Sequence, residues 1–392
     1  MVVRPRRPGT YVPICFSIEN PPQADLKINE IMEGPAVFLI LVINPGSTTT
    51  KLALYQDETS LWTETITYTA SRLSPFQQSL EQVSMRFQDI KNLLDSKEVH
   101  TASLSAVAAR GGPFKSLRSG TYAVTERLVH DIEAGHVQAD HISNTGAILA
   151  YRVAEEGRIP AYFVDPVSVD EFSPVARLSG LPELERKSLL HALNIRATCF
   201  RAAADLGRPV DRCNFIVAHM GGGISVCPVQ EGRMIDVNNA NEEGPFSPER
   251  TGTLPAGSLA KLCFSGKYTY DQMKKKLVGQ GGMTAYLGTS DLQAVEKRIA
   301  AGDEEAGLVV RAMAYQIAKE IGAMATVLKG RVDAVLLTGG LAKSDLLNRW
   351  IGERIRFLGP VLVYAGENEM DALCLGVLRV LRNEEAVRDY HE

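Results

Sequence analysis

The chain has 392 residues, of which 45% are apolar and 22% charged, a composition typical of a globular protein with two domains. Its formal net charge of −4 excludes a general electrostatic attraction to nucleic acid or to an anionic membrane. The six cysteines are scattered without a C-x-x-C pair, and no apolar run approaches the roughly 18 residues of a membrane helix. These features predict a reduced, cytoplasmic protein without a disulfide framework or a zinc site.

The first residues differ in composition from the rest of the chain. They are rich in Pro and Arg and show no helical or strand period. A signal peptide is the alternative, but Pro13 interrupts the apolar run Tyr11–Ile18 and no small-residue cleavage site follows. We therefore expect residues 1–36 to form a disordered leader.

A short segment beginning at Phe38 stands out. An apolar run stops at Asn44, small polar residues follow, and an alternating run resumes after Lys51, which predicts a β-hairpin. Its tip can cradle phosphate oxygens, because Gly46 lets the backbone approach and the hydroxyls add donors. The Walker A spacing is absent. By itself the segment leaves two interpretations, a phosphate cradle and a turn that only reverses the chain, and the second is the commoner.

Periodicity and turn residues predict the next elements in chain order. Ser74 and Pro75 predict the N-cap and first position of a helix. The elements are a strand over 58–69, a helix over 76–94, a strand over 104–109, helical structure over 125–157 interrupted near 141–144, a strand over 161–166, and a helix over 184–206 that carries His191.

The segment 214–236 repeats the layout of the first hairpin. An apolar strand ends at His219, where the first ends at Asn44, and a Gly-rich turn, an alternating strand, a second turn and a third strand follow. Two related halves, each with a phosphate-binding hairpin, predict a nucleotide in the cleft between them. A chance likeness between two β-meanders is the alternative.

The rest of the chain completes an α/β pattern. The near-continuous apolar strand over 332–340 is typical of a sheet covered on both faces. The other predicted elements are a loop over 244–252, a solvated helix face at 274–276, a helix over 305–329 closed by Gly330, a helix over 346–357, a strand over 361–364 and a last helix after 368.

Three of these segments, Asn44–Lys51, His219–Gly223 and Thr338–Gly340, resemble the two phosphate motifs and the adenosine motif of the acetate kinase family. That family belongs to the superfamily of sugar kinases, heat-shock chaperone ATPases and actin. Further segments resemble its butyrate kinase branch: Ala109–Gly112, Val164–Val167, Glu185–Asn194, Gly244–Arg250 and Leu262–Tyr268. The resemblance runs in order from about residue 38 to 382, and the ordered set is far more specific than any one motif.

The resemblance implies an α/β fold of two duplicated actin-like (ribonuclease H-like) ATPase domains with a nucleotide cleft between them. We expect an N-terminal domain over 37–160, completed by the C-terminal helix at about 371–392. A C-terminal domain over 161–370 is expected to hold the adenosine site and a dimer interface. The family implies a homodimer or a larger assembly of dimers.

The implied activity is reversible transfer of the γ-phosphoryl group of MgATP to butanoate, giving butanoyl phosphate and ADP. A preference for branched-chain acids, acetate or propionate stays open, because each methylene changes discrimination by only about 1–3 kcal/mol. A non-catalytic nucleotide switch like actin is a remote alternative. Asp165, His191 and Arg250 argue against it, since a switch needs no carboxylate site.

The resemblance implies that Asp165, Arg250 and His191 are catalytic and that Arg110 binds substrate. Transfer between two anions requires converging cations, and the planar fork of arginine matches carboxylate and phosphate oxygens. Acetate kinase has an arginine three residues before the position of Arg110, where this chain has Val107. The family's substrate arginine is therefore displaced or absent, and the role of Arg110 is open. Read without the resemblance, these residues are a turn aspartate, surface arginines and a structural histidine.

The resemblance also implies an ATP site and Mg²⁺ as cofactor. Asn44 and Glu369 are the nearest expected protein partners of the metal, with Glu367 and Asp371 as alternatives to Glu369. Lys51 is either a phosphate partner or a solvated strand lysine. The expected ATP-binding residues are Ser47, Thr48, Thr49, Lys51, His219, Gly221, Gly222, Gly223, Asp291, Gly339 and Gly340.

Overall fold

The computed structural model describes residues 37–391, so the leader expected over residues 1–36 lies outside the described residues. The first of two mixed sheets contains β1 (Leu39–Pro45), β2 (Thr49–Gln56), β3 (Thr59–Thr67), β4 (Ala106–Arg110), β5 (Thr121–Ala123) and β6 (Ala161–Val164). Its order is β3-β2-β1-β4-β6-β5. The predicted hairpin is confirmed, because β1 and β2 pair antiparallel, whereas β1, β4 and β6 are parallel.

The second sheet repeats this arrangement. Its strands are β7 (Asn214–Met220), β8 (Ile224–Gln230), β9 (Arg233–Met234), β10 (Ala334–Gly339) and β11 (Val361–Ala365). In the order β9-β8-β7-β10-β11, three antiparallel strands are followed by parallel ones, as in β3-β2-β1-β4-β6. The predicted duplication is therefore confirmed at the level of sheet topology.

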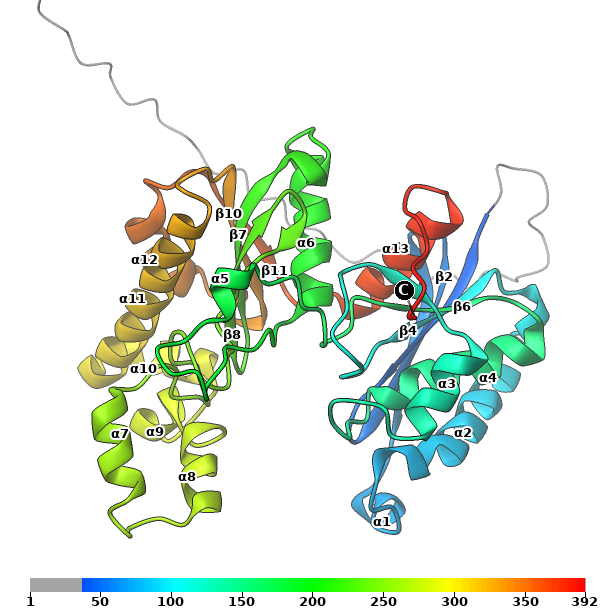
Figure 1. Ribbon diagram of the computed structural model, residues 1–392, viewed down its shortest axis with the longest axis horizontal. Coiled ribbons are helices and arrows are strands. Elements are labelled where there is room, and N and C mark those ends of the chain that lie inside the picture. Colours follow the sequence, from blue (N-terminus) through cyan, green and yellow to red (C-terminus); the bar gives the residue numbers. More distant parts are fainter. Residues whose placement is uncertain (1–36, 392) are drawn as a thin grey trace, which may run out of the picture. The chain divides into compact units, whose positions relative to one another are not determined.

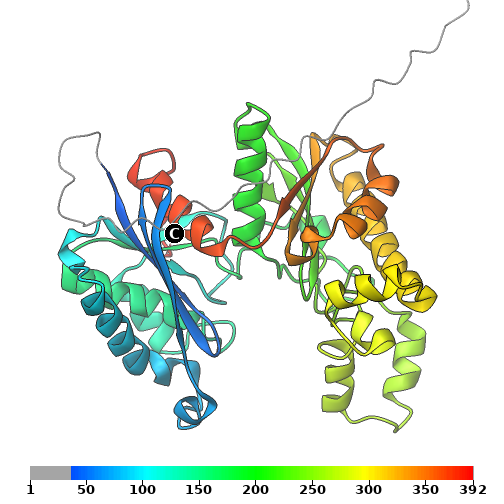
Figure 2. The same cartoon turned by 180° about the vertical axis from the view of Figure 1, so that it is seen from behind.

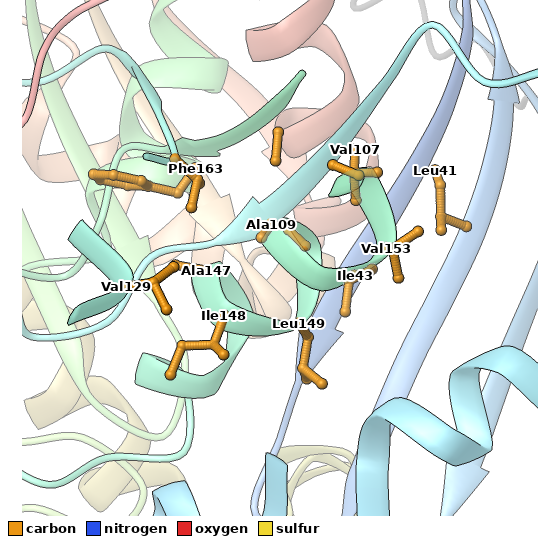
Figure 3. Packing of buried hydrophobic residues seen from close by; sticks show 14 of the residues in the cluster. Leu41, Ile43, Val107, Ala109, Val129, Ala147, Ile148, Leu149, Val153 and Phe163 are labelled. Carbon is orange, nitrogen blue, oxygen red and sulfur yellow. The ribbon is translucent and has the colours of Figure 1, made fainter. Parts of the chain in front are cut away.

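Helices cover both faces of the first sheet (Figures 1 and 2). One face packs against α2 (Val83–Ser96), α3 (Glu126–Glu133) and α4 (Asn144–Gly157). Figure 3 shows side chains of β1 and β4 against Ala147, Ile148 and Val153 of α4. The opposite face packs against α13 (Glu369–Leu381), whose Leu373 and Val377 are fully buried.

The second sheet is covered in the same way. Helix α6 (Ala192–Asp205) packs on one face, and α11 (Glu304–Val327) and α12 (Asp345–Ile355) pack on the other. Helix α6 lies in the chain between the two sheets and packs on the second sheet. Helix α13 follows the second sheet in the chain and packs on the first. The remaining helices are α1 (Ala70–Leu73), α5 (Pro174–Arg177), α7 (Ala256–Cys263), α8 (Tyr270–Leu277), α9 (Gly282–Leu287) and α10 (Leu292–Ala300), with 3-10 turns at η1 (Ser79–Gln82), η2 (Thr101–Ser103), η3 (Val210–Arg212) and η4 (Gly340–Lys343).

The predicted helix start at Ser74 and Pro75 is wrong. Ser74 is the C-cap of α1, which Thr69 caps at its other end through a 3.3 Å bond from the Arg72 amide. The next helical turn starts only at η1, where the Glu81 carboxylate accepts hydrogen bonds from the amides before it. Local capping thus overrides the Ser-Pro signal.

The helix predicted over 184–206 begins only at Ala192, so His191 is its N-cap and lies outside its body. The preceding segment is held by side-chain contacts instead. Arg186 donates to Asp236 and Glu243 at 3.0 Å each, while Leu184 is 63% exposed and supports no buried helical face.

Other expectations on secondary structure hold. The loop over 244–252 contains no helix or strand, Lys274–Lys276 are exposed on α8, and Gly330 follows α11 with a φ of +73°. Strand β6 lies beyond the domain boundary expected after residue 160 and pairs with β4, so the first sheet extends past that boundary to Val164. Among residues 37–391, none of the helices combines the length and apolarity that crossing a bilayer requires.

The central strand β10 allows a test of the packing. Leu336 is fully buried between α6 and its neighbours, so we expect Leu336→Ala to lower the free energy of unfolding by about 2–5 kcal/mol through lost burial and a residual cavity. Leu308 of α11 is 65% exposed, and Leu308→Ala should change the free energy of unfolding by less than about 0.5 kcal/mol. Urea unfolding followed by circular dichroism measures both, and equal shifts of the midpoint would contradict this packing.

Candidate active site

Several predicted site residues line one small cavity of about 20 Å³. They come from the carboxyl ends of strands in both sheets and from the first residues of α6 and α13, the edge at which α/β folds place ligands. The polar and charged residues in its lining are Arg110, Asp165, His191, Asn194, His219, Glu367 and Glu369.

Asp165 follows β6 in a left-handed conformation with a φ of +39°, which is unfavourable for a residue with a side chain. Reciprocal bonds with Gly120 hold it there. The Asp165 amide donates to the Gly120 carbonyl at 3.0 Å, and Oδ1 accepts from the Gly120 amide at 2.6 Å. Oδ2 accepts from Arg196 at 3.3 Å. Burial raises the pKa of Asp165 above its ordinary value, and Arg196 opposes that rise.

Two histidines stack beside Asp165 in the cavity. The rings of His191 and His219 lie 4.0 Å apart at an angle of 15°. His219 Nδ1 bonds the Asn194 side chain at 2.8 Å, and its Nε2 lies 3.4 Å from Glu367 Oε1. Burial, followed by the proximity of His219, lowers the pKa of His191 to about 3. His191 is therefore neutral at pH 7 and can serve as a hydrogen-bond donor without carrying a charge.

Glu369 joins two other predicted residues. Arg110 donates to Glu369 Oε1 at 2.5 Å, and the Asn44 side-chain amide donates to Oε2 at 2.8 Å. Arg110 is thus within reach of a carboxylate in this cavity. The expected metal partners Asn44 and Glu369 are in direct contact.

The donor set around Glu369 suits Mg²⁺. Glu367, Glu369, Asp371 and the Asn44 side-chain carbonyl line a neighbouring pocket and offer hard oxygen ligands. Glu369 would have to release its bonds from Arg110 and Asn44 to bind the ion, and Asp371 its bond from the Tyr55 hydroxyl at 2.5 Å. Among residues 37–391 no group of three or more His, Cys, Asp or Glu side chains is gathered for a metal.

The first predicted phosphate turn is fixed from behind by a residue that the sequence reasoning missed. Arg86 of α2 is fully buried and donates to the Ser47 carbonyl at 3.2 Å and the Thr49 carbonyl at 2.8 Å. Ser47, Thr48 and Lys51 themselves are exposed. An arginine at an apolar position of the predicted helix was the available signal, since such a charge requires internal partners.

The second turn, over 221–223, lies against Arg250. A Cβ on Gly223 would stand 2.3 Å from Arg250 Nη1, so a larger residue here would displace the guanidinium from the turn. The Gly222 carbonyl accepts a 2.5 Å bond from Ser247. Burial lowers the pKa of Arg250, although Glu249 opposes that effect. The structure thus brings Arg250 to the glycine turn.

The three residues predicted on the adenosine side do not lie together: Gly339 and Gly340 are at the end of β10, and Asp291 is at the start of α10. Gly339 has a φ of +89° and exchanges backbone bonds of 3.1 and 3.0 Å with Gly366, while a Cβ on it would lie 2.5 Å from the Met220 carbonyl. Gly340 opens η4 directly after it. Asp291 is exposed, caps α10 through the Gln293 amide at 2.9 Å, and lines neither the cavity nor the neighbouring pocket around Lys51.

Solved structures of low sequence identity share this fold. Acetate kinase from Porphyromonas gingivalis superposes with a TM-score of 0.71 at 19% identity, over 88% of this chain and 100% of that chain. A propionate kinase from Francisella tularensis superposes with a TM-score of 0.68 at 18% identity, over 86% and 98%. The predicted fold of two duplicated actin-like domains is therefore confirmed.

Sequence comparison reaches further. Residues 187–362 match the model of the acetokinase family. The chain is 50% identical over 354 residues to a protein of Caldanaerobacter subterraneus subsp. tengcongensis named probable butyrate kinase 2, covering 90% of this chain and 100% of that protein. Such identity over the full length of a relative is decisive, and this chain belongs to the acetokinase family.

Proposed function

We propose that this protein transfers the γ-phosphoryl group of MgATP to a short-chain carboxylate, with butanoate as preferred acceptor, and catalyses the reverse reaction. The observation that carries the proposal is the 50% identity to the protein named probable butyrate kinase 2. The cavity that gathers Arg110, Asp165 and His191 supports it.

The proposed reaction is a direct displacement. A carboxylate oxygen forms a bond to the γ-phosphorus, the bond from that phosphorus to the bridging oxygen breaks, and ADP leaves with the electron pair. Because the carboxylate is already a nucleophile, the protein mainly positions the reactants and neutralises charge.

Each site residue then has a proposed task. Arg110 binds the acceptor carboxylate with the fork that now holds Glu369. Arg250 and neutral His191 stabilise the transferring group, because a fixed cation and a fixed donor need no reorganisation as charge develops. Asp165 holds the reacting groups in line. Asn44 and Glu369 would hold Mg²⁺, which would neutralise charge at the phosphates.

Nucleotide contacts follow from the two turns. We assign the phosphates to Ser47–Thr49, Lys51, His219 and Gly221–Gly223. The adenosine side falls to Gly339, Gly340 and Asp291.

We further propose a cytoplasmic homodimer, or an assembly of such dimers. Among the exposed side chains of the described residues, Phe264 at the end of α7 and Tyr270 at the start of α8 are 92% and 80% exposed. Apolar and aromatic exposure of this kind is typical of subunit interfaces, and it supports placing the dimer contact in the C-terminal half.

Trapping with hydroxylamine tests the reaction, because an acyl phosphate gives a coloured hydroxamate with ferric iron. We expect product with MgATP and butanoate, and less with acetate, propionate or isobutyrate at equal concentration. A higher kcat/KM for one of those acids would reassign the preferred acceptor. Absence of product from every acid would contradict the proposed function.

Asp165→Asn tests the aspartate. We expect turnover to fall at least about 10³-fold while ATP still binds, since the amide keeps the shape but not the charge. Asp211→Asn, at an exposed position of η3, is the matched control. Coupled kinetics and calorimetric ATP titration measure the two properties. Wild-type turnover in Asp165→Asn would remove this residue from the mechanism.

The burial of His191 predicts a pH dependence of stability. Its pKa falls from 6.5 to about 3 on folding, so between these values the unfolded chain binds one proton more than the folded chain. The stabilising effect of the neutral ring is complete above pH 6.5 and declines by up to about 1.4 kcal/mol per pH unit as the pH falls towards 3.

The unfolding free energy of the wild type falls as the pH drops from 6.5 to 4. His191→Gln should make the slope of this fall shallower, by the amount that corresponds to the uptake of about one proton on unfolding. His100→Gln, at an exposed position, should leave the slope nearer to that of the wild type. Urea unfolding at several pH values measures the slopes. An unchanged slope in His191→Gln would show that this ring is not the group that resists protonation.

A further inference from the structure

The last residues of the chain form a segment that we call the C-terminal strap, residues 384–391. It runs beside β5 at the edge of the first sheet, where the Arg388 amide donates to Thr121 at 2.8 Å and the Ala123 amide donates to Arg388 at 3.1 Å. Tyr390 is only 4% exposed and packs edge-on against Phe114 at 6.2 Å. The strap is thus anchored by both backbone pairing and a buried ring.

One side chain of the strap reaches towards the cavity. Glu385 accepts from Arg196 Nη2 at 2.9 Å with one oxygen and from Arg379 Nε at 3.0 Å with the other. Through Nη1, the same Arg196 guanidinium donates to Asp165 Oδ2 at 3.3 Å. Glu385 does not line the cavity, so it acts on Asp165 only through Arg196.

The strap also touches the second donor to Asp165. The amide of Gly120 donates to Asp165 Oδ1, and Arg388 lies directly over this glycine. A Cβ on Gly120 would stand 2.4 Å from Arg388 Nε, and 3.4 Å from Glu385 Oε1. Both side-chain hydrogen bonds of Asp165 therefore come from residues that the strap contacts.

The charges of this cluster are balanced and poorly hydrated. Two carboxylates, Asp165 and Glu385, face two guanidinium groups, Arg196 and Arg379, and each of the four side chains is at most 15% exposed. The ring of Phe200 lies under both guanidinium groups, at 4.9 and 4.0 Å. Charge pairs in such surroundings are strongly coupled, because little water screens them.

Removal of one carboxylate would upset this balance. Without Glu385, two cations would face the single carboxylate of Asp165. Arg196 Nη2 would lose its hydrogen-bond acceptor Glu385, so both terminal nitrogens of the Arg196 guanidinium could then donate to Asp165. A bidentate pair would then pull the Asp165 carboxylate away from the cavity and tie up the lone pairs that it offers there.

We propose that the C-terminal strap is a positioning element of the active site and that Glu385, through Arg196, sets the orientation of Asp165. This inference rests on the proposed carboxylate kinase function. Glu385 is a positioning residue, because it contacts neither the cavity nor a reacting atom.

The test compares Glu385→Gln with Glu384→Gln, its exposed neighbour on the same strap. We expect Glu385→Gln to lower kcat for butanoate by about tenfold or more, with KM for ATP within about twofold of the wild type, because nucleotide contacts are elsewhere. Glu384→Gln should match the wild type in both constants. Glu385→Asp, which keeps the charge, should recover part of the lost kcat.

Circular dichroism and thermal unfolding of the same samples separate positioning from folding. A wild-type kcat in Glu385→Gln would overturn the inference. It would also be overturned if activity per folded molecule stayed constant while stability fell, or if Glu384→Gln lost as much kcat as Glu385→Gln. A wild-type enzyme that forms no acyl phosphate from any acid would instead overturn the proposed function, and the inference with it.

Discussion

The exchange of helices between the two sheets is the constraint on which the site depends. Helix α6 packs on the second sheet and α13 on the first, and each begins at the edge where the parallel strands end. His191 occupies the N-cap position of α6 and Glu369 is the first residue of α13, and both side chains line the same cavity. The N-terminal ends of two helices carry partial positive charge, which favours the anions that a phosphoryl transfer brings together.

Electrostatics inside the cavity follow from burial. Arg110 supplies the cation that lines the cavity, Arg250 lies at the glycine turn over 221–223, and His191 stays neutral because its burial disfavours a charge. Two of the three acids that line the cavity accept hydrogen bonds, Glu369 from Arg110 and Asn44 and Asp165 from Gly120 and Arg196, and the third is Glu367. Arg110, Asp165 and Glu369 thus have partners that fix their positions before a ligand arrives, a preorganisation that favours this kind of catalysis.

The sequence predicts the elements whose signals are local. Both hairpins, the long helix α11 and the buried strand β10 follow from turn residues and periodicity, and the repeated layout predicts the shared topology of the sheets. Where capping or tertiary contacts decide, the pattern misleads. The start of α6 is the clearest case, because Arg186 binds Asp236 and Glu243 and thereby keeps the preceding segment out of the helix.

Contacts within the site are harder to predict, because the partners are far apart in the chain. Arg110 and Glu369 are separated by 259 positions, and Arg196 and Glu385 by 189. No spacing rule links residues at such distances. The family resemblance supplies candidates for individual positions, but it does not reveal that Asn194 bridges His219 and Thr338 or that Arg86 holds the first turn.

The packing of α13 also has a consequence for the order in which the protein is made. Ile40 and Val42 of β1 are synthesised long before Leu373 and Val377, the α13 residues that cover them. Until α13 is made, one face of the first sheet therefore lacks its permanent cover. The first sheet can complete its core only after the second sheet, which precedes α13 in the chain, has been synthesised.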